Sequence, residues 1–409
     1  MKNYVKHSRF RVSNFIRKKR GEQQIHYNAY ADIALRVLQL STTGLRSLDL
    51  LTVFPSPNLN FIFGKNNAGK TSLLEALYLC GNAKSFKQTN VDSLIKKDKK
   101  SLKVLLKSVK FDEKYSISYE KTLNTQKKAK INDKSANTFS LMVQTPLMCL
   151  TFGSENLINL PPEYRRGLLD TGLFHVKHEY YEIYRSFSNN LKQRNKLLKT
   201  ATYENLDFWT NKIIEDSLII NKHRDDYFQE LQRAYATIIQ EIVGFDKETY
   251  DDIKSSQISY YQGWPKDLSM KEACASCLDK DKALKYSTAG PHRADVFITT
   301  NADNIKEIGS MSTQIIVSLC FMLAQARVFH VKQKYSPILL IDDLFFGIDD
   351  KNLALVINLL LESKIQCFLT APDLYKETIT GLNLDHKETK MFELKNGVIA
   401  EEKNAKKNI

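Results

Sequence analysis

The feature that most constrains the fold is a glycine-rich segment directly behind a short apolar stretch at residues 61–63. The segment fits the spacing G-x-x-x-x-G-K-[ST], and apolar residues recur at helical spacing after it. Its residues are Gly64, Lys65, Asn66, Asn67, Ala68, Gly69, Lys70 and Thr71, followed by Ser72. A strand, this pattern and a helix, in that order, are what a phosphate-binding loop requires. The alternative is an ordinary glycine-containing turn before a helix.

The residue types in this loop suit a nucleoside triphosphate. Glycines let the backbone curl, so that successive N–H groups and the positive end of the following helix point at one phosphate chain. We expect Lys70, on an exposed loop, to reach the β- and γ-phosphates. The hydroxyl of Thr71 would hold Mg²⁺. The loop from residue 64 to residue 72 therefore predicts ATP and Mg²⁺ as cofactors.

Composition narrows the class of partner. The chain has 409 residues, a formal net charge of +14 and an isoelectric point near 9.2. Such a balance predicts an anionic partner, either nucleic acid or an acidic membrane surface. No run of eighteen or more apolar residues is present, which argues against an ordinary transmembrane helix and a membrane partner. The basic residues 1–33 lack the apolar core of a secretory signal, and are expected to be a transit-like segment, a nucleic-acid-binding arm or a loosely ordered extension.

Hydrophobic patterns divide the remaining chain into three parts. Strand patterns and the phosphate loop place residues 34–162 in the first part of an ATPase head, with a Lys-rich region that predicts antiparallel hairpins. Apolar residues at helical spacing dominate residues 163–286, which we expect to form a helical arm. Residues 287–409 return to alternating strands and helices. The prediction is an α/β fold with a parallel core sheet, an antiparallel β subdomain and a mostly α-helical insertion.

A second motif supplies carboxylates for the same site. The stretch ILLIDD at residues 338–343 is an apolar run followed by two aspartates. A strand buried on both faces needs such a run, and its carboxyl end is where α/β sheets place ligands. We expect Asp342 to act in the Mg²⁺ shell, and Asp343 to orient or deprotonate the attacking water. A solvated Asp-Asp turn is the alternative.

Four stretches together resemble the RecF family of bacterial recombination mediators, whose ATPase heads belong to the SMC-like branch of ABC-type ATPases. They are GKNNAGKTSLLEALY, PPEYRRGLLDTGLFH with LKQRNKLL, GPHRAD and ILLIDD, in this order. The resemblance runs from about residue 34 to residue 370 and has no counterpart for residues 1–33. It implies a cytoplasmic, ATP-dependent homodimer that binds DNA, especially gapped or junction DNA, and assists RecA loading with RecO and RecR. It also implies that ATP bound to one head meets a signature segment of the other.

The signature segment is where this chain departs from the family. The family usually has Ser-x-Gly-Gln before a helix. This chain has Ser310 at the serine position, but Ser312 stands in place of the glycine and Thr313 in place of the glutamine. A Cβ at residue 312 is expected to obstruct the close backbone approach that glycine permits. Phe346 and Gly347 also stand where the family commonly has Ser or Ala and Glu.

Two further positions of the site differ from the family. Gln144 is the nearest candidate for a glutamine that touches the metal or water, although it lies upstream of the expected spacing. The usual histidine after the last core strand is absent, and Thr370 is the polar residue at that strand end.

The remaining motif residues are expected to serve binding or structure. The lysines between residues 96 and 130 predict a basic face for the DNA backbone, with a solvated charged face as the alternative. A set of polar residues in the second and third motifs is expected to brace the arm rather than to catalyse. These are Arg165, Arg166, Asp170, His292 and Arg293.

Three functions remain open at this point. The first is a weak, dimerising ATPase of recombinational DNA repair and replication. The second is a scaffold that binds ATP and DNA with little or no hydrolysis, which the altered signature segment favours. The third is the ATPase subunit of an ABC transporter, which would need a docking surface for membrane helices.

Overall fold

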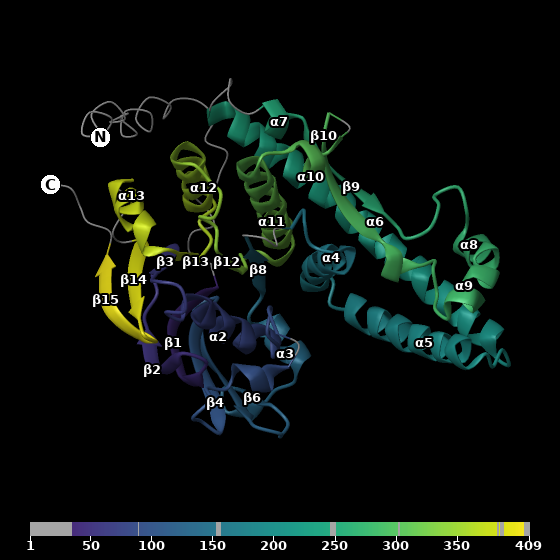
Figure 1. Ribbon diagram of the computed structural model, residues 1–409, viewed down its shortest axis with the longest axis horizontal. Helices are drawn as coiled ribbons and strands as arrows, with labels where there is room; N and C mark the ends of the chain where they lie inside the picture. Colours follow the sequence, from purple (N-terminus) through teal and green to yellow (C-terminus); the bar gives the residue numbers. More distant parts are fainter. Residues whose placement is uncertain are drawn as a thin grey trace.

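The computed structural model describes residues 35–404, apart from residues 89, 153–156, 246–250, 302, 383 and 385–387. The extension predicted for residues 1–33 lies outside the described residues. Figure 1 shows a head that contains the two large sheets and an arm of long helices that extends away from it. This arrangement agrees with the predicted fold class.

A six-stranded sheet with mostly parallel strands forms the centre of the head. Its spatial order is β15 (Val398–Asn404), β14 (Thr389–Lys395), β3 (Leu59–Phe63), β13 (Cys367–Ala371), β12 (Ile338–Asp342) and β8 (Leu147–Thr151). All neighbouring pairs are parallel except β14 with β15. Every residue of β3, β12 and β13 is buried, which explains why their sequences are mostly apolar; Asn60 in β3 and Thr370 in β13 are buried polar exceptions. Their carboxyl ends meet at one edge of the sheet, where the phosphate loop begins.

The second sheet is antiparallel and forms a lobe below the first in Figure 1. Its order is β2 (Leu48–Val53), β1 (Arg36–Leu45), β4 (Ser101–Lys110), β5 (Glu113–Thr122), β6 (Lys128–Ile131) and β7 (Lys134–Ser135). Apolar side chains alternate with exposed lysines along β4. The inner face therefore joins the core beneath α2 (Lys70–Asn82), and the predicted basic face points outward.

The longest helix of the head is α11 (Met311–Gln333), which packs against α4, α6, α12 and β8. By length and composition it could cross a membrane, although polar residues interrupt its apolar sequence. However, 83% of its most apolar window is buried inside the protein. Its apolar residues therefore belong to the core of the head. The other head helices are α3 (Thr138–Gln144), α10 (Ile305–Ile308), α12 (Asp350–Glu362) and α13 (Lys376–Gly381), with short 3₁₀ turns at Val91–Leu94, Pro291–Arg293 and Asp373–Tyr375.

The arm is built around two antiparallel helices, α5 (Tyr180–Thr200) and α6 (Leu206–Phe245). The elements around them are α4 (Pro162–Val176), α7 (Asp251–Lys254), α8 (Met270–Ser276) and α9 (Leu278–Leu284). The arm also contains a strand, β9 (Ser256–Tyr261), which pairs with β10 (Asp295–Thr300) and through it with β11 (Asp303–Asn304). The region predicted to be mostly helical thus contributes one strand to a small sheet.

Buried ion pairs hold the arm together. Arg224 is fully buried and donates two hydrogen bonds to Asp170, at 2.9 Å each. Arg165 makes a bidentate pair with Asp295 at the start of β10. His292 Nε2 donates a hydrogen bond to the Ser287 carbonyl, 3.0 Å away. The two ion pairs support the predicted bracing role, because each joins segments that are far apart in the sequence, whereas the His292 contact is local.

Candidate nucleotide-binding site

The phosphate loop connects the buried strand β3 to α2, as its pattern predicts. Gly69 has a φ of 108°, a conformation that L-amino acids with side chains rarely adopt. A Cβ at Gly64 would lie 2.7 Å from the Leu394 carbonyl oxygen, so glycine is needed there for space. Lys65, Asn66 and Asn67 are exposed between these two glycines. The loop is therefore held at both ends and open to solvent at its centre.

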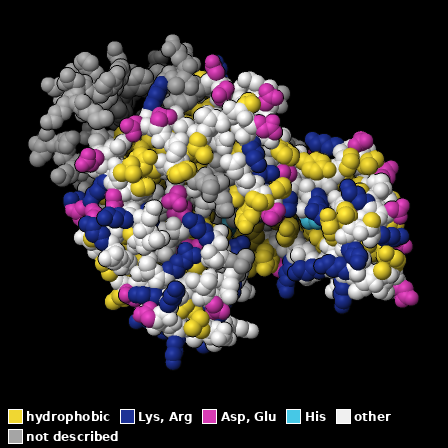
Figure 2. All heavy atoms as spheres, in the orientation of Figure 1, with side chains coloured by type: hydrophobic (Ala, Val, Ile, Leu, Met, Phe, Trp, Pro, Cys, Tyr) yellow, Lys and Arg dark blue, Asp and Glu magenta, His cyan; other side chains and the backbone are white. Residues whose placement is uncertain are grey.

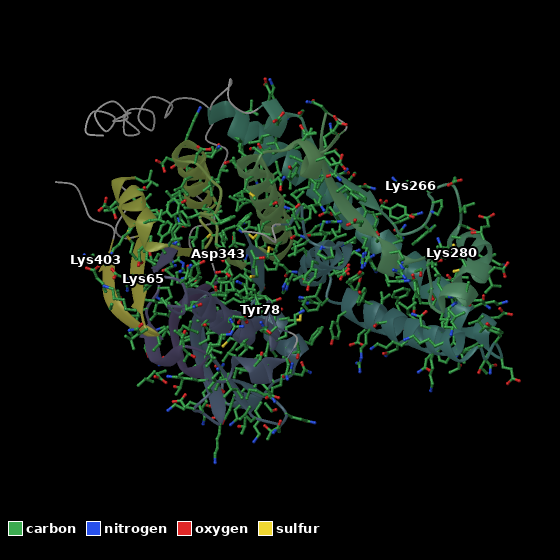
Figure 3. The ribbon with its side chains drawn as sticks, viewed as in Figure 1. Lys65, Tyr78, Lys266, Lys280, Asp343 and Lys403 are labelled. Atoms are coloured by element: carbon green, nitrogen blue, oxygen red, sulfur yellow. The ribbon has the colours of Figure 1, made fainter. Side chains whose placement is uncertain are left out.

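The C-terminal hairpin of β14 and β15 braces this loop. The Gly397 amide donates a 3.2 Å hydrogen bond to the Ala68 carbonyl. Asn396 and Gly397 have φ values of 50° and 79°, as in a tight hairpin turn. Figure 3 marks Lys65 on the side of the loop near this hairpin and Asp343 closer to the middle of the head. The sequence reasoning assigned no role to this hairpin, although Asn-Gly between two apolar runs is a strong hairpin signal.

Lys70 differs from the expectation of a lysine on an exposed loop. It is 8% exposed, and its Nζ donates hydrogen bonds to the Gly64 and Lys65 carbonyls, at 2.7 and 3.1 Å. Burial lowers the pKa of Lys70. The cause is that α2 begins at Lys70 itself, so the Lys70 side chain folds back into the curl of the loop. Its ammonium is therefore held against the first residues of the loop.

Asp342 ends strand β12 and is fully buried. The Thr71 hydroxyl lies 3.1 Å from both of its carboxylate oxygens. The Thr370 hydroxyl donates to Oδ1 at 2.7 Å, and Lys87 Nζ lies 2.6 Å from Oδ2. A hydroxyl and a carboxylate that already touch are the hard oxygen ligands that Mg²⁺ prefers, so Thr71 and Asp342 fit the metal. Ser72, next to Thr71, is buried and packs inside the first turn of α2.

Asp343 lies immediately beyond the strand in a strained conformation. Its φ is 58°, and its amide donates a 2.8 Å bond to the Thr370 hydroxyl. Aspartate tolerates this left-handed region better than most residues, and such strain concentrates at functional sites. Burial, and then the neighbouring Asp342 charge, raise the pKa of Asp343. A carboxylate with a raised pKa at the mouth of the site suits a group that accepts a proton from water.

Two residues of this site were missed or undervalued by sequence reasoning. Thr370 binds both aspartates of the second motif, whereas the sequence marked it only as a polar residue at a strand end. Lys87 lies in the segment after α2 and had no assigned role. For Thr370 the signal is topological, because β13 lies between β3 and β12, next to both motifs. No local pattern points to Lys87.

Gln144 does not lie at this edge of the sheet. It ends α3 just before β8, and β8 runs parallel to β12 with Leu147 opposite Ile338 and Thr151 opposite Asp342. The residue is therefore at the amino end of the strand, whereas the candidate metal ligand is at the carboxyl end. The proposed role of Gln144 at the metal or water is wrong.

The signature segment forms the N-terminus of α11, where Ser310 is exposed and residues 311–313 are half-buried. The Ser310 hydroxyl accepts a bond from the Thr313 amide at 3.1 Å and caps the helix. The Ser312 hydroxyl donates to the Gly347 carbonyl at 3.2 Å and to Asp349 at 3.3 Å. In the part of the chain that the structure describes, no hydrogen bond joins Ser310 or Ser312 to the phosphate loop of the same head. Within one head, Ser310 is thus not brought together with the other candidate nucleotide ligands.

Comparison with known proteins identifies the family. Residues 36–379 match the family described as the RecF/RecN/SMC N-terminal domain. The RecF DNA replication and repair protein of Pseudomonas putida strain W619 is 30% identical over 342 residues, which cover 82% of this chain and 90% of that protein. The chain belongs to the RecF family. The RecF protein of Hahella chejuensis is 29% identical over 370 residues, covering 88% of this chain and 98% of the relative.

Solved structures share the fold. A structure described as the recombination mediator protein RecF with ATP in the RecFOR pathway matches with a TM-score of 0.73 and 20% identity, over 91% of this chain and 99% of that chain. The Smc head domain of Pyrococcus furiosus matches with a TM-score of 0.53 and 14% identity, over 89% of this chain and 95% of that one. The RecF/SMC type of ATPase head, with its helical insertion, is therefore the fold of this RecF-family protein.

Proposed function

We propose that this RecF-family protein binds Mg·ATP in its head, dimerises through the bound nucleotide and holds DNA, especially gapped or junction DNA, in recombinational repair in the cytoplasm. The observation that carries the proposal is the convergence of Thr71 and Asp342 next to the curled phosphate loop. The relatives' names place those proteins in DNA replication and repair and in the RecFOR pathway, and we propose RecO and RecR as partners of this chain on that ground.

Each site residue would have a distinct task. The amides of residues 64–72 and Lys70 would hold the phosphate chain, and Thr71 with Asp342 would hold Mg²⁺. A bound magnesium ion supplies charge neutralisation on the transferred phosphoryl group. Asp343 would orient the attacking water and take its proton, for which its pKa is raised. Thr370 would fix Asp342 and the Asp343 backbone relative to each other.

The exposed signature segment supports a dimer rather than a complete site within one head. Ser310 is exposed and Ser312 half-buried at the N-terminus of a 23-residue helix, which is a favourable place for an anion. Two large apolar side chains are exposed close to this segment: Ile308, just before it in sequence, is 51% exposed, and Phe346, next to the Gly347 that bonds Ser312, is 61% exposed. A second copy of the head would cover these groups and bring Ser310 to its γ-phosphate. Slow hydrolysis is expected, because Ser312 stands where the family usually has glycine, and its Cβ would hinder the close approach of this backbone to the γ-phosphate.

The outer face of the antiparallel sheet is one candidate DNA surface. The strand pairing places Lys103 of β4 beside Glu120 of β5 and Lys128 of β6, and Lys130 lies two residues farther along. Lys103 forms an ion pair with Glu120 at 3.2 Å, so part of this charge is already neutralised. Figure 2 shows lysines and arginines mixed with acidic side chains over the lobe. The face suits phosphate contacts, with no grouping of side chains that would recognise bases.

A second basic surface lies on the arm, where the sequence analysis expected none. Lys192, Lys196 and Lys199 are exposed on α5 at spacings of four and three residues, so they lie along one side of the helix. Within the described residues, none of the three forms a salt bridge. Figure 2 shows dark blue side chains along the lower edge of the arm. We propose this stripe as a further contact for the DNA backbone.

The proposed function is tested by ATP turnover and dimerisation of the purified protein, with and without gapped DNA. Turnover that rises with protein concentration and with gapped DNA is expected. Binding of ATP without dimerisation or turnover would favour the scaffold alternative instead.

The two basic surfaces are separated by a matched pair of triple variants. Lys192, Lys196 and Lys199→Gln in the arm should weaken DNA binding and reduce the slope of log affinity against log salt by up to about 0.9 for each lost phosphate contact. Lys97, Lys99 and Lys100→Gln removes the same charge from the edge of the lobe, where Lys96 is already paired with Asp49. An unchanged salt slope in both variants would place the DNA elsewhere.

A further inference from the structure

Lys87 occupies the position of a cation in the candidate metal site. Its Nζ lies 2.6 Å from Asp342 Oδ2, while the Asp342 side chain is completely buried. The Lys87 side chain itself is 35% exposed, so it enters the site from the surface. The ring of Phe86 is its other recorded neighbour, with Nζ 6.0 Å from the ring centre. The contact with Asp342 is therefore the main polar interaction that holds this ammonium.

The buried carboxylate needs positive charge when no metal is bound. An isolated carboxylate in a protein interior is strongly unfavourable unless it is paired and hydrogen-bonded. Two hydroxyls, from Thr71 and Thr370, donate to Asp342, but neither carries charge. Lys70 does not fill this role, because its ammonium is bonded to two loop carbonyls instead. Lys87 alone makes an ion pair with Asp342 among the described residues.

We propose that Lys87 and Mg²⁺ compete for Asp342, so that Lys87 neutralises the site before Mg·ATP binds and is displaced when it does. A metal ion bound to this carboxylate would approach to about 2.1 Å. The ammonium at 2.6 Å from the same group would then face a second, doubly charged cation at close range. Their repulsion forces Lys87 away from Asp342. This inference rests on the proposed nucleotide site and adds a residue that sets how strongly that site depends on metal.

The segment that carries Lys87 is fixed on its other side. The Ser85 hydroxyl donates to the buried Glu75 at 2.8 Å and accepts bonds from the amides of Lys87 and Gln88. The Lys127 ammonium donates to the Ala83 carbonyl at 2.6 Å. The backbone at residues 83–88 is thus anchored, and displacement of Lys87 requires only that its long side chain swing outward. The exchange is a local movement rather than an unfolding of the segment.

The test measures nucleotide binding as a function of Mg²⁺ and does not depend on turnover. Lys87→Met should lower the Mg²⁺ concentration needed for half-maximal ATP binding by about tenfold, because the metal no longer displaces a charge-assisted bond. The same variant should bind ATP in EDTA about tenfold more weakly, because Asp342 is left uncompensated near the phosphates. Mg²⁺ alone, without nucleotide, should raise the melting temperature of Lys87→Met more than that of the parent.

Two controls separate this role from general charge effects. Lys84→Met removes the same charge three residues away, where no contact with Asp342 is recorded, and should leave both affinities near those of the parent. Lys87→Arg keeps the charge and should keep the high Mg²⁺ requirement. If Lys87→Met does not fold, Lys87→Gln takes its place. Equal Mg²⁺ midpoints for Lys87→Met and Lys84→Met would overturn the proposal.

Failure of the nucleotide site itself would look different. A parent protein that binds no ATP at any Mg²⁺ concentration would refute the proposed function. The melting experiment with Mg²⁺ alone would still test the competition, because it needs only Asp342 and Lys87. An equal Mg²⁺ shift in parent and Lys87→Met would then refute the competition as well.

Discussion

The phosphate loop and the signature segment both belong to the candidate ATP site, but the structure treats them in opposite ways. In the first region, Lys70 and Asp342 are buried, and each has polar partners within the same head. In the second, Ser310 is exposed and Ser312 is half-buried, and their hydroxyls bond to Thr313, Gly347 and Asp349 rather than to the phosphate loop. The residues of the first region meet within one head, whereas the second would meet nucleotide only in the dimer that we propose.

This difference predicts which property a substitution in each region should change. Substitutions at the phosphate loop act on a site that is already assembled, so they change ATP capture by a single head. In the proposed dimer, substitutions at the signature segment would act on a surface that meets only the nucleotide of the other head. Binding and dimerisation can therefore be altered separately, and three predictions test that separation.

The largest effect is expected from Lys70→Ala. The variant loses the charge at the centre of the phosphate loop, and ATP affinity should fall by about a hundredfold, which corresponds to about 2.7 kcal/mol. A small loss of melting temperature is also expected, because the Gly64 and Lys65 carbonyls lose their donor. Titration with a fluorescent nucleotide and thermal melting measure the two effects.

The matched control is Lys65→Ala, in the same loop. Lys65 is exposed, and the loop uses its carbonyl rather than its ammonium. Its removal should change ATP affinity by no more than about threefold, as for other exposed charges. Equal losses in the two variants would mean that the loop attracts phosphate by its overall positive charge and not through the buried Lys70.

The second effect concerns the two aspartates. Asp342→Asn should weaken Mg·ATP binding by about tenfold, since a metal ligand and the partner of Lys87 are lost together. Asp343→Asn should keep ATP affinity within about threefold and lower turnover by about a hundredfold, and ATP-bound dimer should accumulate. Nucleotide titration, turnover and sizing in ATP and Mg²⁺ would distinguish them. Identical behaviour would contradict the division between metal holding and water activation.

The pKa of Asp343 gives this pair a pH-dependent control. Because burial raises that pKa, the folded state holds the proton more tightly than the unfolded chain. The stability that the protonated Asp343 adds to the folded state is present at low pH. It is lost as pH rises from the ordinary pKa of aspartate through the raised pKa of Asp343. Asp343→Asn should remove this loss and raise the melting temperature at neutral pH by about 1 to 2 °C. Melting curves at acid and neutral pH measure the difference.

The smallest effect is expected at the signature segment. Ser312→Gly should raise dimerisation and turnover by about threefold, while ATP binding to the single head stays unchanged. The structure offers two reasons: the lost Cβ, and the lost bonds from the Ser312 hydroxyl to Gly347 and Asp349. Net worth of about 1 kcal/mol for such bonds is consistent with a change of this size. Turnover measured across protein concentrations detects it.

Ser312→Ala separates the two reasons, because it removes the hydroxyl and keeps the Cβ. If alanine gains as much as glycine, the hydrogen bonds restrain the segment; if only glycine gains, bulk at the contact limits the approach. If the parent protein already dimerises tightly and neither variant improves it, the prediction of weak dimerisation through this segment is refuted.

The sequence by itself determined the parts that depend on local spacing. The phosphate loop, the buried strand before Asp342 and the basic alternation of β4 follow from residue patterns only a few positions long, because strand and helix periodicity dictates which side chains share a face. The order of motifs was enough to predict the RecF family, which the comparisons bear out.

Only the tertiary structure decided which distant residues share the site. Sheet order places β13 between β3 and β12, and so brings Thr370 to both aspartates; the same register moves Gln144 to the opposite edge. Lys87 reaches Asp342 from the segment after α2, a separation of 255 residues in the numbering of the two positions. No local pattern encodes such contacts, because they depend on the packing of the strands and not on the neighbours of each residue.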